Sequence, residues 1–306
     1  MMKAKRNGNL FEFELPNKLN GMTIETILKE HWSTPKKMLH QFRMDKAVQI
    51  NGENLSWNKP LKAHDLFSIA IFKEEDFGVV PEYHPVEILY EDEHLLVANK
   101  PAGMDTHPNV EGQTNTLANA IAFHYQQNGE ACRVRHVHRL DHDTTGAVLF
   151  AKHAWGHAIL DHLLNKREIK RTYWALVHGT PHPLSGVITQ PIGRDRHHPT
   201  RRRVSKTGQA AKTNYAVKQQ FHKQQLSLVE CTLDTGRTHQ IRVHMSSIGH
   251  PIAGDTLYGG KTIFQRQALH ARKLNLIHPF TENAIECIAP FHDEPAIFED
   301  YVKQIQ

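Results

Sequence analysis

Histidine side chains, which can bind metal ions or carry protons, gather at two places in the sequence. They are His136, His138 and His142 in one segment and His197-His198 in another. No acidic or cysteine ligands accompany them at a spacing that metal sites use, so we expect no bound metal. Asp141 lies in the first segment, and a carboxylate can serve as a nucleophile or as a proton carrier. Taken alone, such an aspartate is more often a helix cap or one partner of a surface ion pair.

Positive charge is concentrated around the same part of the chain. Residues 131–213 contain 15 Lys and Arg against 5 Asp and Glu, a net charge of +10, whereas the whole chain has a net charge of +5. Lysine and arginine displace counterions from phosphates, so this concentration favours contact with a polyanion. A solvated basic face is the plain alternative.

The segment 193–206 is strongly basic, with six Lys or Arg against one Asp. It separates two predicted strands and lacks apolar periodicity, so we expect a loop. Loops beside a catalytic strand are well placed to hold a substrate. We therefore expect Arg201, Arg202 and Arg203 to contact phosphates, with a flexible solvated turn as the alternative.

Hydrophobic periodicity beyond residue 85 predicts the elements that must position these residues. We expect strands at 86–90, 95–98, 147–151, 172–177, 213–221 and 226–233, and helices at 116–127, 154–164 and 238–248. Strands and helices are mixed without regular β-α alternation, which favours an α+β fold around a mixed, mainly antiparallel sheet. Arg242 lies at the margin of an apolar helical stripe, where its stem can be buried while the guanidinium reaches a site.

The chain divides near residue 80, where an acidic segment followed by Pro81 and Pro85 is typical of a linker. We predict domains at 1–80 and 81–306. The first should contain helices at 23–30 and 35–42, a strand at 48–50 that ends in the turn Asn51-Gly52, and a strand at 66–72.

This αα-β arrangement resembles the S4 RNA-binding module. The resemblance depends on V-Q-I-N-G at 48–52 and on the lysine-to-aspartate turn at 62–65, and it departs from the family where Lys46 replaces a usual glycine. It implies an RNA-binding role for residues 1–80, with a small structural cap as the alternative.

Composition limits the class of protein further. The chain has 39% hydrophobic residues, lacks an apolar run of membrane-spanning length and begins without an apolar signal core. Cys132, Cys231 and Cys287 are odd in number and widely spaced, which does not support a disulfide framework. We expect a monomeric cytoplasmic protein that does not enter membranes.

Five sequence motifs stand in order between residues 100 and 279. They are KPAG with HP at 100–108, HRLDHDTTGAVLFAK at 138–152, KRTYWALVHG at 170–179, GRTHQIRVHM leading to GHPIAGD at 236–255, and LHA with HP at 269–279. Together they resemble the RluA-type pseudouridine synthases, whose signature is H-R-L-D-x-x-T-S-G-L-L-x-x-A-K. Thr145 replaces the usual serine and keeps its hydroxyl. The resemblance covers about residues 86–290.

The resemblance implies an enzyme that isomerises uridine to pseudouridine in structured RNA, ribosomal or transfer, without a cofactor. The reaction cleaves the C1′–N1 bond, turns the uracil and joins C5 to C1′. The resemblance names Asp141 as the nucleophile, Arg242 as its buried partner and Tyr173 as the residue that packs against the uracil and relays the proton. Attack on the sugar and attack on the base both stay open. A buried arginine suits a nucleophilic carboxylate, because it favours the ionised form while burial removes water.

Further residues of these motifs are expected to bind the substrate: Arg139, His138, Thr144 and His239. Arg139 could fill the space left by an extracted uridine, although structural ion pairing is equally open. Two other functions are conceivable, a catalytically silent RNA-binding or ribosome-assembly protein with the same fold and a hydrolytic nucleosidase that releases uracil. The joint presence of Asp141, Tyr173 and Arg242 favours the synthase over the silent binder.

Overall fold

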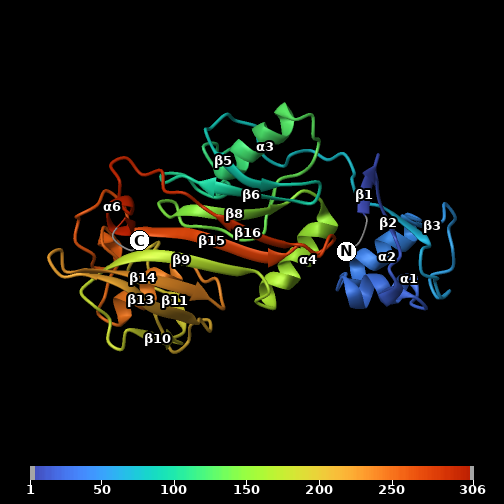
Figure 1. Ribbon diagram of the computed structural model, residues 1–306. Coiled ribbons are helices and arrows are strands. Elements are labelled where there is room, and N and C mark those ends of the chain that lie inside the picture. Colours follow the sequence, from blue (N-terminus) through green and yellow to red (C-terminus); the bar gives the residue numbers. More distant parts are fainter. Residues whose placement is uncertain (1–3, 304–306) are drawn as a thin grey trace.

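The computed structural model describes residues 4–303, which form a small N-terminal sheet beside a larger one (Figure 1). The small sheet is antiparallel, with strand order β1-β2-β4-β3, and helical segments pack on it. We call residues 4–72 the N-terminal module. Its elements are β1 (Ala4–Asn7), β2 (Leu10–Glu14), a 3-10 turn (Asn17–Leu19), α1 (Ile24–Thr26) continued by a π-helical turn (Ile27–His31), α2 (Lys36–Met44), β3 (Val48–Ile50) and β4 (Leu66–Ala70).

The helix pair and strands β3 and β4 lie where the sequence predicts them, whereas the hairpin β1–β2 was not expected. The turn at Asn51-Gly52 forms but leads back through a single bridge, Ile50 to Glu53, so β3 pairs with the later strand β4. The Asn51 amide donates to Asp65, which joins the two turns of the S4-like pattern. Lys46 has a φ of 50°, which explains why a glycine is common there.

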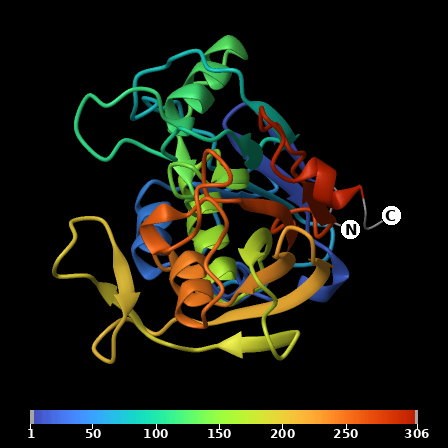
Figure 2. The same cartoon turned by 90° about the vertical axis from the view of Figure 1, so that its left-hand side faces the viewer.

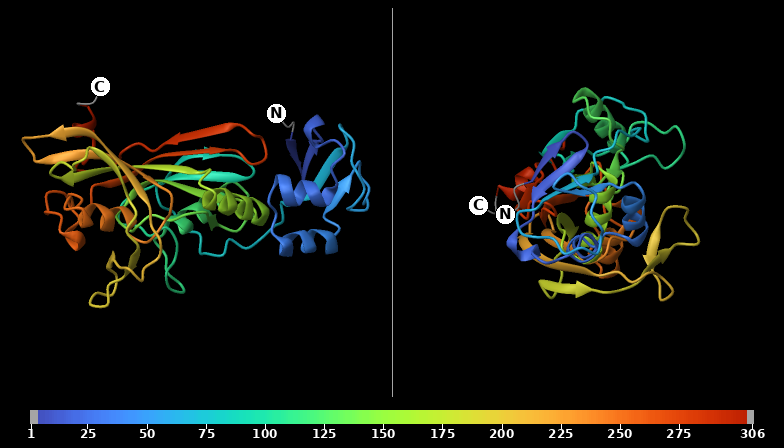
Figure 3. Two further views of the ribbon diagram at one scale, coloured as in Figure 1. Left: turned by 90° about the horizontal axis from the view of Figure 1, so that it is seen from below. Right: turned by 90° about the vertical axis from the view of Figure 1, so that its right-hand side faces the viewer.

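The N-terminal module shares an apolar cluster with the rest of the chain. Trp155, Ile159 and Phe280 pack among the module's own core residues. The Trp155 indole donates to the Thr34 hydroxyl at 2.9 Å, and the Trp32 indole donates to the Pro279 carbonyl at 3.0 Å. Figure 3 shows the module at one end of an elongated molecule, with α4 (Ala154–Asn165) next to it.

The segment between the two parts is ordered against its surroundings. The Glu75 amide donates to the Ala131 carbonyl, Phe77 accepts from the Val134 amide, and Glu82 donates to the Asn119 carbonyl. The segment near residue 80, which has the composition of a linker, therefore lies along the larger part of the chain and is held there by backbone hydrogen bonds.

The larger part is built on a ten-stranded sheet whose main path is β10-β13-β14-β9-β15-β8-β6-β5. Strands β16 and β7 pair with β15 and β8 off this path. The strands are β5 (Glu87–Glu91), β6 (Leu95–Lys100), β7 (Arg135–His136), β8 (Thr145–Ala151), β9 (Lys170–His178), β10 (Ser185–Ile188), β13 (Thr213–Phe221), β14 (Leu226–Leu233), β15 (Leu269–Ile277) and β16 (Ala284–Ile288). Only β15 and β8 pair in parallel among the named ladders of this sheet within residues 4–303, so the mixed, mainly antiparallel α+β prediction is confirmed.

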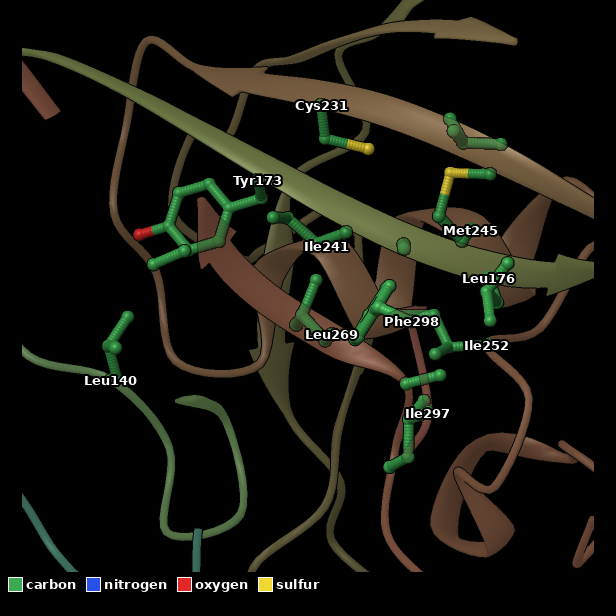
Figure 4. Close-up of a cluster of buried hydrophobic side chains, with 14 of the residues drawn as sticks. Leu140, Tyr173, Leu176, Cys231, Ile241, Met245, Ile252, Leu269, Ile297 and Phe298 are labelled. Atoms are coloured by element: carbon green, nitrogen blue, oxygen red, sulfur yellow. The ribbon is translucent and has the colours of Figure 1, made fainter. Parts of the chain in front are cut away.

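Alternation along β6 and β8 divides the core into two layers. Val148 and Phe150 face the layer that contains α3 (Leu117–Gln127) and α5 (Gln240–Ser247), whereas Leu149 and Ala151 face the layer beneath α4. The first layer includes Tyr173, Ile241 and Leu269 side by side (Figure 4). Because both faces are covered, every residue of β6 and β8 is buried, and successive side chains alternate between the two layers.

The parallel junction of β8 and β15 depends on a glycine. Gly146 pairs with Ala271 at a φ of 112°, and a Cβ there would lie 2.3 Å from the Ala271 carbonyl oxygen. A larger residue would separate the two halves of the sheet at this point.

The segment 193–206, expected as a loop, contains a short hairpin instead. Strands β11 (Ile192–Arg194) and β12 (Arg202–Val204) pair antiparallel, with a long connection between them. Three-residue strands are too short to show periodicity, which is why the sequence pattern gave no strand signal. Figure 2 shows the hairpin, in yellow, standing away from the body of the molecule.

Two short elements complete the described chain, a 3-10 turn at Thr256–Tyr258 and α6 (Glu299–Val302). None of the helices within residues 4–303 is long and apolar enough to cross a membrane.

Candidate active site

A cavity of about 670 Å³ opens beside the loop between β7 and β8, where strand β9 and the start of α5 also meet it. It is lined by seven of the residues that the sequence singled out: Asp141, Tyr173, Arg242, Arg139, His138, Thr144 and His239. Arg201, Arg202 and Arg203 do not line it, because they belong to the hairpin β11–β12.

Arg242 connects two carboxylates at the centre of the cavity wall. Its Nε and Nη2 donate to Asp255 Oδ2 and Oδ1 at 2.7 and 2.9 Å, and its Nη1 donates to Asp141 Oδ2 at 3.2 Å. The Arg242 side chain is 9% exposed, that of Asp255 1% and that of Asp141 19%. Burial alone would lower the pKa of Arg242, but Asp255 and Asp141 outweigh it and raise that pKa. Arg242 therefore stays charged beside Asp141.

Only one oxygen of Asp141 is engaged by these contacts. Arg242 bonds Oδ2, and His239 Nε2 lies 3.9 Å from the same atom. Within residues 4–303 no hydrogen bond is made to Oδ1. The arrangement holds the carboxylate by one side and leaves its other oxygen available to a reacting atom.

The loop that contains Asp141 is fixed from both sides. The Thr106 hydroxyl bonds both the amide and the carbonyl of Leu140, each at 3.0 Å. On the other side, Lys100 Nζ donates to the carbonyls of His142, Met104 and Pro101 at 2.8, 2.6 and 2.8 Å. Burial lowers the pKa of Lys100 to about 7, but three carbonyls around one nitrogen match the three donors of an ammonium group. The roles of Lys100 and Thr106 could not be predicted from the sequence.

The start of α5 places His239 and Arg242 together. His239 has a φ of 58°, a left-handed conformation that is uncommon outside glycine. Gln240 holds this turn, since its side-chain oxygen accepts from the Arg237 amide and its nitrogen donates to Lys212 O and Thr213 Oγ1. Burial lowers the pKa of His239, although Asp141 opposes this shift.

Tyr173 lies on β9 and is 4% exposed. Figure 4 shows its ring beside Ile241, with the hydroxyl directed away from that residue. Burial raises the pKa of this hydroxyl, an effect that the neighbouring Arg171 opposes. Its position at the cavity wall suits contact with a planar base.

The remaining predicted residues differ in exposure. Arg139 is exposed at the cavity, whereas His138 and Thr144 are buried beneath it, at 6% and 2% exposure. His138 Nε2 accepts from the Leu149 amide at 3.3 Å, and Thr144 Oγ1 accepts from Gln267 at 3.4 Å. These two residues touch the cavity but also support strand β8 and its loop.

The histidines that raised the question of a metal point to different partners. His136 stacks on His107 with ring centroids 4.3 Å apart, and His142 pairs with Asp143 at 2.7 Å. In the part of the chain that the structure describes, no three His, Cys, Asp or Glu side chains converge as a metal site would need.

The cavity has a positive excess that extends beyond Arg242. Its lining includes five arginines, namely Arg139, Arg167, Arg171, Arg237 and Arg242, against three aspartates, namely Asp141, Asp161 and Asp234. The hairpin adds Arg203, which is exposed, while Arg201 pairs with Asp195 through Nε at 2.7 Å. Figures 2 and 3 show the hairpin and the green loop that precedes α3 projecting from the same side of the molecule.

A carboxylate held by a buried arginine in a cavity lined by further arginines is typical of an enzyme whose substrate is a polyanion such as nucleic acid. Residues 94–247 match the family model for RNA pseudouridylate synthase, and residues 11–67 match that of the RluD ribosomal pseudouridine synthase N-terminal domain. The chain belongs to the RluA-type family of RNA pseudouridine synthases, which confirms the resemblance of its motifs.

Individual relatives agree with this assignment. The chain is 49% identical to an uncharacterized RNA pseudouridine synthase of Bacillus subtilis (YhcT), over 94% of this chain and 95% of the relative. It is 35% identical to ribosomal large subunit pseudouridine synthase D of Nitrosomonas europaea, over 99% of this chain and 90% of the relative. Among solved structures, human RNA pseudouridylate synthase domain containing 4 superposes with a TM-score of 0.55 at 26% identity, covering 68% of this chain and 89% of that chain.

Proposed function

We propose that this enzyme isomerises uridine in ribosomal RNA of the large subunit, with Asp141 as the nucleophile and without a cofactor. The role of Asp141 is proposed because Arg242 lies between Asp141 and Asp255 and is hydrogen-bonded to both. The ribosomal substrate is supported by the similarity along nearly the whole chain to a ribosomal large subunit pseudouridine synthase.

The reaction breaks the C1′–N1 bond, forms C5–C1′ and transfers a proton from C5 to nitrogen of the uracil. Arg242 places a positive charge 3.2 Å from Asp141 Oδ2, and the partial burial of Asp141 limits its hydration. The unbonded Oδ1 then attacks either the sugar or the base of the uridine, while Arg242 holds Oδ2 in place. The bond to Oδ1 breaks again before the product leaves, so the carboxylate is regenerated. The rearrangement is redox-neutral, so it needs no electron donor or acceptor.

The other cavity residues would bind the flipped uridine. Tyr173 packs against the uracil and relays the C5 proton, which requires a hydroxyl within reach of the base. The exposed Arg139 is free to occupy the space that the uridine leaves in the RNA stack. His138, Thr144 and His239 complete the walls around the nucleotide.

The hairpin and the N-terminal module would hold the surrounding RNA. Arg201, Arg202 and Arg203 stand outside the cavity on a hairpin that projects beside it, which suits phosphate contacts. The S4-like pattern of residues 1–80, with its turns joined through Asn51 and Asp65, supports an RNA-binding role for the module. We also propose that the enzyme is a monomer in the cytoplasm. Its three cysteines form no disulfide, which agrees with a reducing compartment.

The experiment compares Asp141→Asn with Asp143→Asn in a strain that lacks the gene. Asp143 is a half-exposed neighbour on the same loop that pairs with His142, so it controls for loss of a charge near the site. Pseudouridine mapping of ribosomal and transfer RNA should show a large-subunit site restored by the wild type and by Asp143→Asn but not by Asp141→Asn. Asp141→Asn should bind RNA within a few fold of the wild type, since its shape is unchanged.

Three results would contradict the proposal. Restoration of the site by Asp141→Asn would remove this residue from the chemistry. Restoration of pseudouridine in transfer RNA alone would show that transfer RNA, and not ribosomal RNA, is the substrate. Release of free uracil in place of pseudouridine would indicate a nucleosidase.

A further inference from the structure

Tyr258 is a buried residue that contacts two parts of the site at once. It ends the 3-10 turn that follows Asp255 and is 9% exposed. The Arg242 guanidinium lies over its ring, with the Arg242 Cζ 5.0 Å from the ring centroid. The Ser246 hydroxyl donates to the Tyr258 carbonyl at 2.8 Å, which ties the turn to α5. Its ring is therefore fixed against the catalytic arginine.

The Tyr258 hydroxyl joins the hairpin to His239. The backbone amide of Arg202, on β12, donates to Oη at 2.8 Å. His239 Nδ1 lies 2.7 Å from the same oxygen. Since Oη already accepts from Arg202, its own proton is best donated to Nδ1, which makes Nδ1 an acceptor.

This hydrogen bond determines where the proton of a neutral His239 resides. With Nδ1 accepting, the ring proton is on Nε2, the nitrogen 3.9 Å from Asp141 Oδ2. His239 also has the left-handed backbone conformation noted above, so a side-chain anchor is needed to hold its direction. Hydrogen bonds run from Arg202 through Tyr258 to His239, and His239 Nε2 lies 3.9 Å from the Asp141 carboxylate, longer than a direct hydrogen bond.

We propose that Tyr258 is a positioning residue that couples the RNA-binding hairpin to His239 and, through it, to Asp141. The inference rests on the proposed function, in which the hairpin contacts RNA. The Arg202 amide keeps Oη in place, and Oη in turn directs the Nε2 proton of His239 toward the carboxylate. RNA bound to the hairpin would hold this link in place during turnover. Tyr258 does not line the cavity itself.

The first test needs no RNA substrate. Nitrogen-15 NMR of the full-length protein, with the His239 signals assigned by His239→Gln, should show a neutral imidazole protonated on Nε2. Tyr258→Phe keeps the ring over Arg242 but removes the hydroxyl, so the two tautomers should mix. A wild-type imidazole protonated on Nδ1, or a tautomer unaltered in Tyr258→Phe, would overturn the proposal.

The second test measures single-turnover rates with an unmodified in vitro transcript of large-subunit ribosomal RNA. Tyr258→Phe should lower the rate at saturating RNA by about tenfold, the effect of losing one well-placed hydrogen bond, while the RNA dissociation constant changes less than about twofold. Tyr215→Phe is the matched control, since Tyr215 is 8% exposed, its hydroxyl donates to Pro183 O, and neither residue lines the cavity. Its rate should equal that of the wild type.

Two further variants separate the links of the chain. Arg202→Pro and Arg202→Ala both lose the side chain that is proposed to contact RNA, and only Arg202→Pro also lacks the backbone amide donor. At saturating RNA, Arg202→Pro should therefore be slower than Arg202→Ala by about the rate loss of Tyr258→Phe. If Tyr258 acts through His239, Tyr258→Phe should add no further loss to His239→Gln. The coupling would be refuted if the rate losses of Tyr258→Phe and His239→Gln multiply in the double variant, or if Tyr258→Phe has an unaltered rate. A wild-type enzyme inactive on this transcript would refute the proposed substrate, and the tautomer would still decide the role of Tyr258.

Discussion

Replacing Arg242 with methionine should destabilise the fold mainly through Asp255. Both oxygens of that carboxylate are bonded to Arg242, and its side chain is 1% exposed, so the substitution leaves a buried negative charge without a partner. Breaking a buried pair in this way costs about 3–5 kcal/mol. Asp141, at 19% exposure, keeps part of its hydration and adds less.

The expected change in melting temperature follows from the chain length. An unfolding entropy of about 2.1 cal/mol/K per residue, over 306 residues, converts each kcal/mol into ~1.6 °C. Arg242→Met should therefore melt about 5–8 °C below the wild type and lack activity. Adding Asp255→Asn removes the stranded charge at nearly constant shape, so the double variant should recover at least about 3 °C while remaining inactive.

Thermal melts followed by circular dichroism, beside single-turnover assays, measure both effects. Arg272→Met is the control, because Arg272 is partly buried over Trp174 and Phe291 and makes no salt bridge within residues 4–303. It should lose its packing and one hydrogen bond to the Ala289 carbonyl, but it leaves no buried carboxylate without a partner. A double variant no more stable than Arg242→Met would refute the account, since Asp255 would then carry no uncompensated charge.

Three other predictions follow from the same structure. Replacing Arg201, Arg202 and Arg203 together by alanine should reduce the slope of log affinity against log salt by about 2 to 3 units, measured by RNA titration; an unchanged slope in a folded variant would place the RNA elsewhere. Tyr173→Phe should slow turnover by about 10²-fold or more without weakening RNA binding, and a normal rate would exclude a proton relay by its hydroxyl. Deleting residues 1–80 uncovers Trp155 and Phe280, so light scattering should detect aggregation; a soluble, cooperatively melting fragment would contradict this.

Local periodicity was enough to predict the longer elements of the fold. The helix expected at 154–164 occupies Ala154–Asn165, and the strand expected at 226–233 has those bounds. Each was predictable because its apolar residues recur at the spacing of the face that it buries. Strand β15 was not predicted as a strand, although parts of it were recognised as a motif. Its sequence, LHARKLNLI, mixes charged and apolar residues, and its burial depends on neighbours far away in the chain.

The candidate site was likewise predictable only in part. Motif positions indicated Asp141 and Arg242, which the fold brings to 3.2 Å of each other across 101 residues of sequence. Asp255 also lies in a matched motif, yet no pattern of spacing shows that it holds Arg242 with both oxygens. Arg201 was expected to face phosphates, but its pairing with Asp195 uses part of its charge within the hairpin. Contacts of this kind join residues that become neighbours only in the folded chain, so no periodic pattern in the sequence predicts them.

The central place of β15 sets the order in which this enzyme can be completed during translation. Strand β15 lies between β8 and β9, so the two halves of the sheet remain unjoined until residues 269–277 have been synthesised. At about 5–20 residues per second, the interval from the end of β9 to the start of β15 lasts roughly 5–18 s. Throughout that interval a nascent chain exposes two unpaired strand edges, which are prone to pair with other chains. A chaperone that covers these edges should raise the yield of active enzyme, and chains that terminate before β15 should be inactive however well their first half folds.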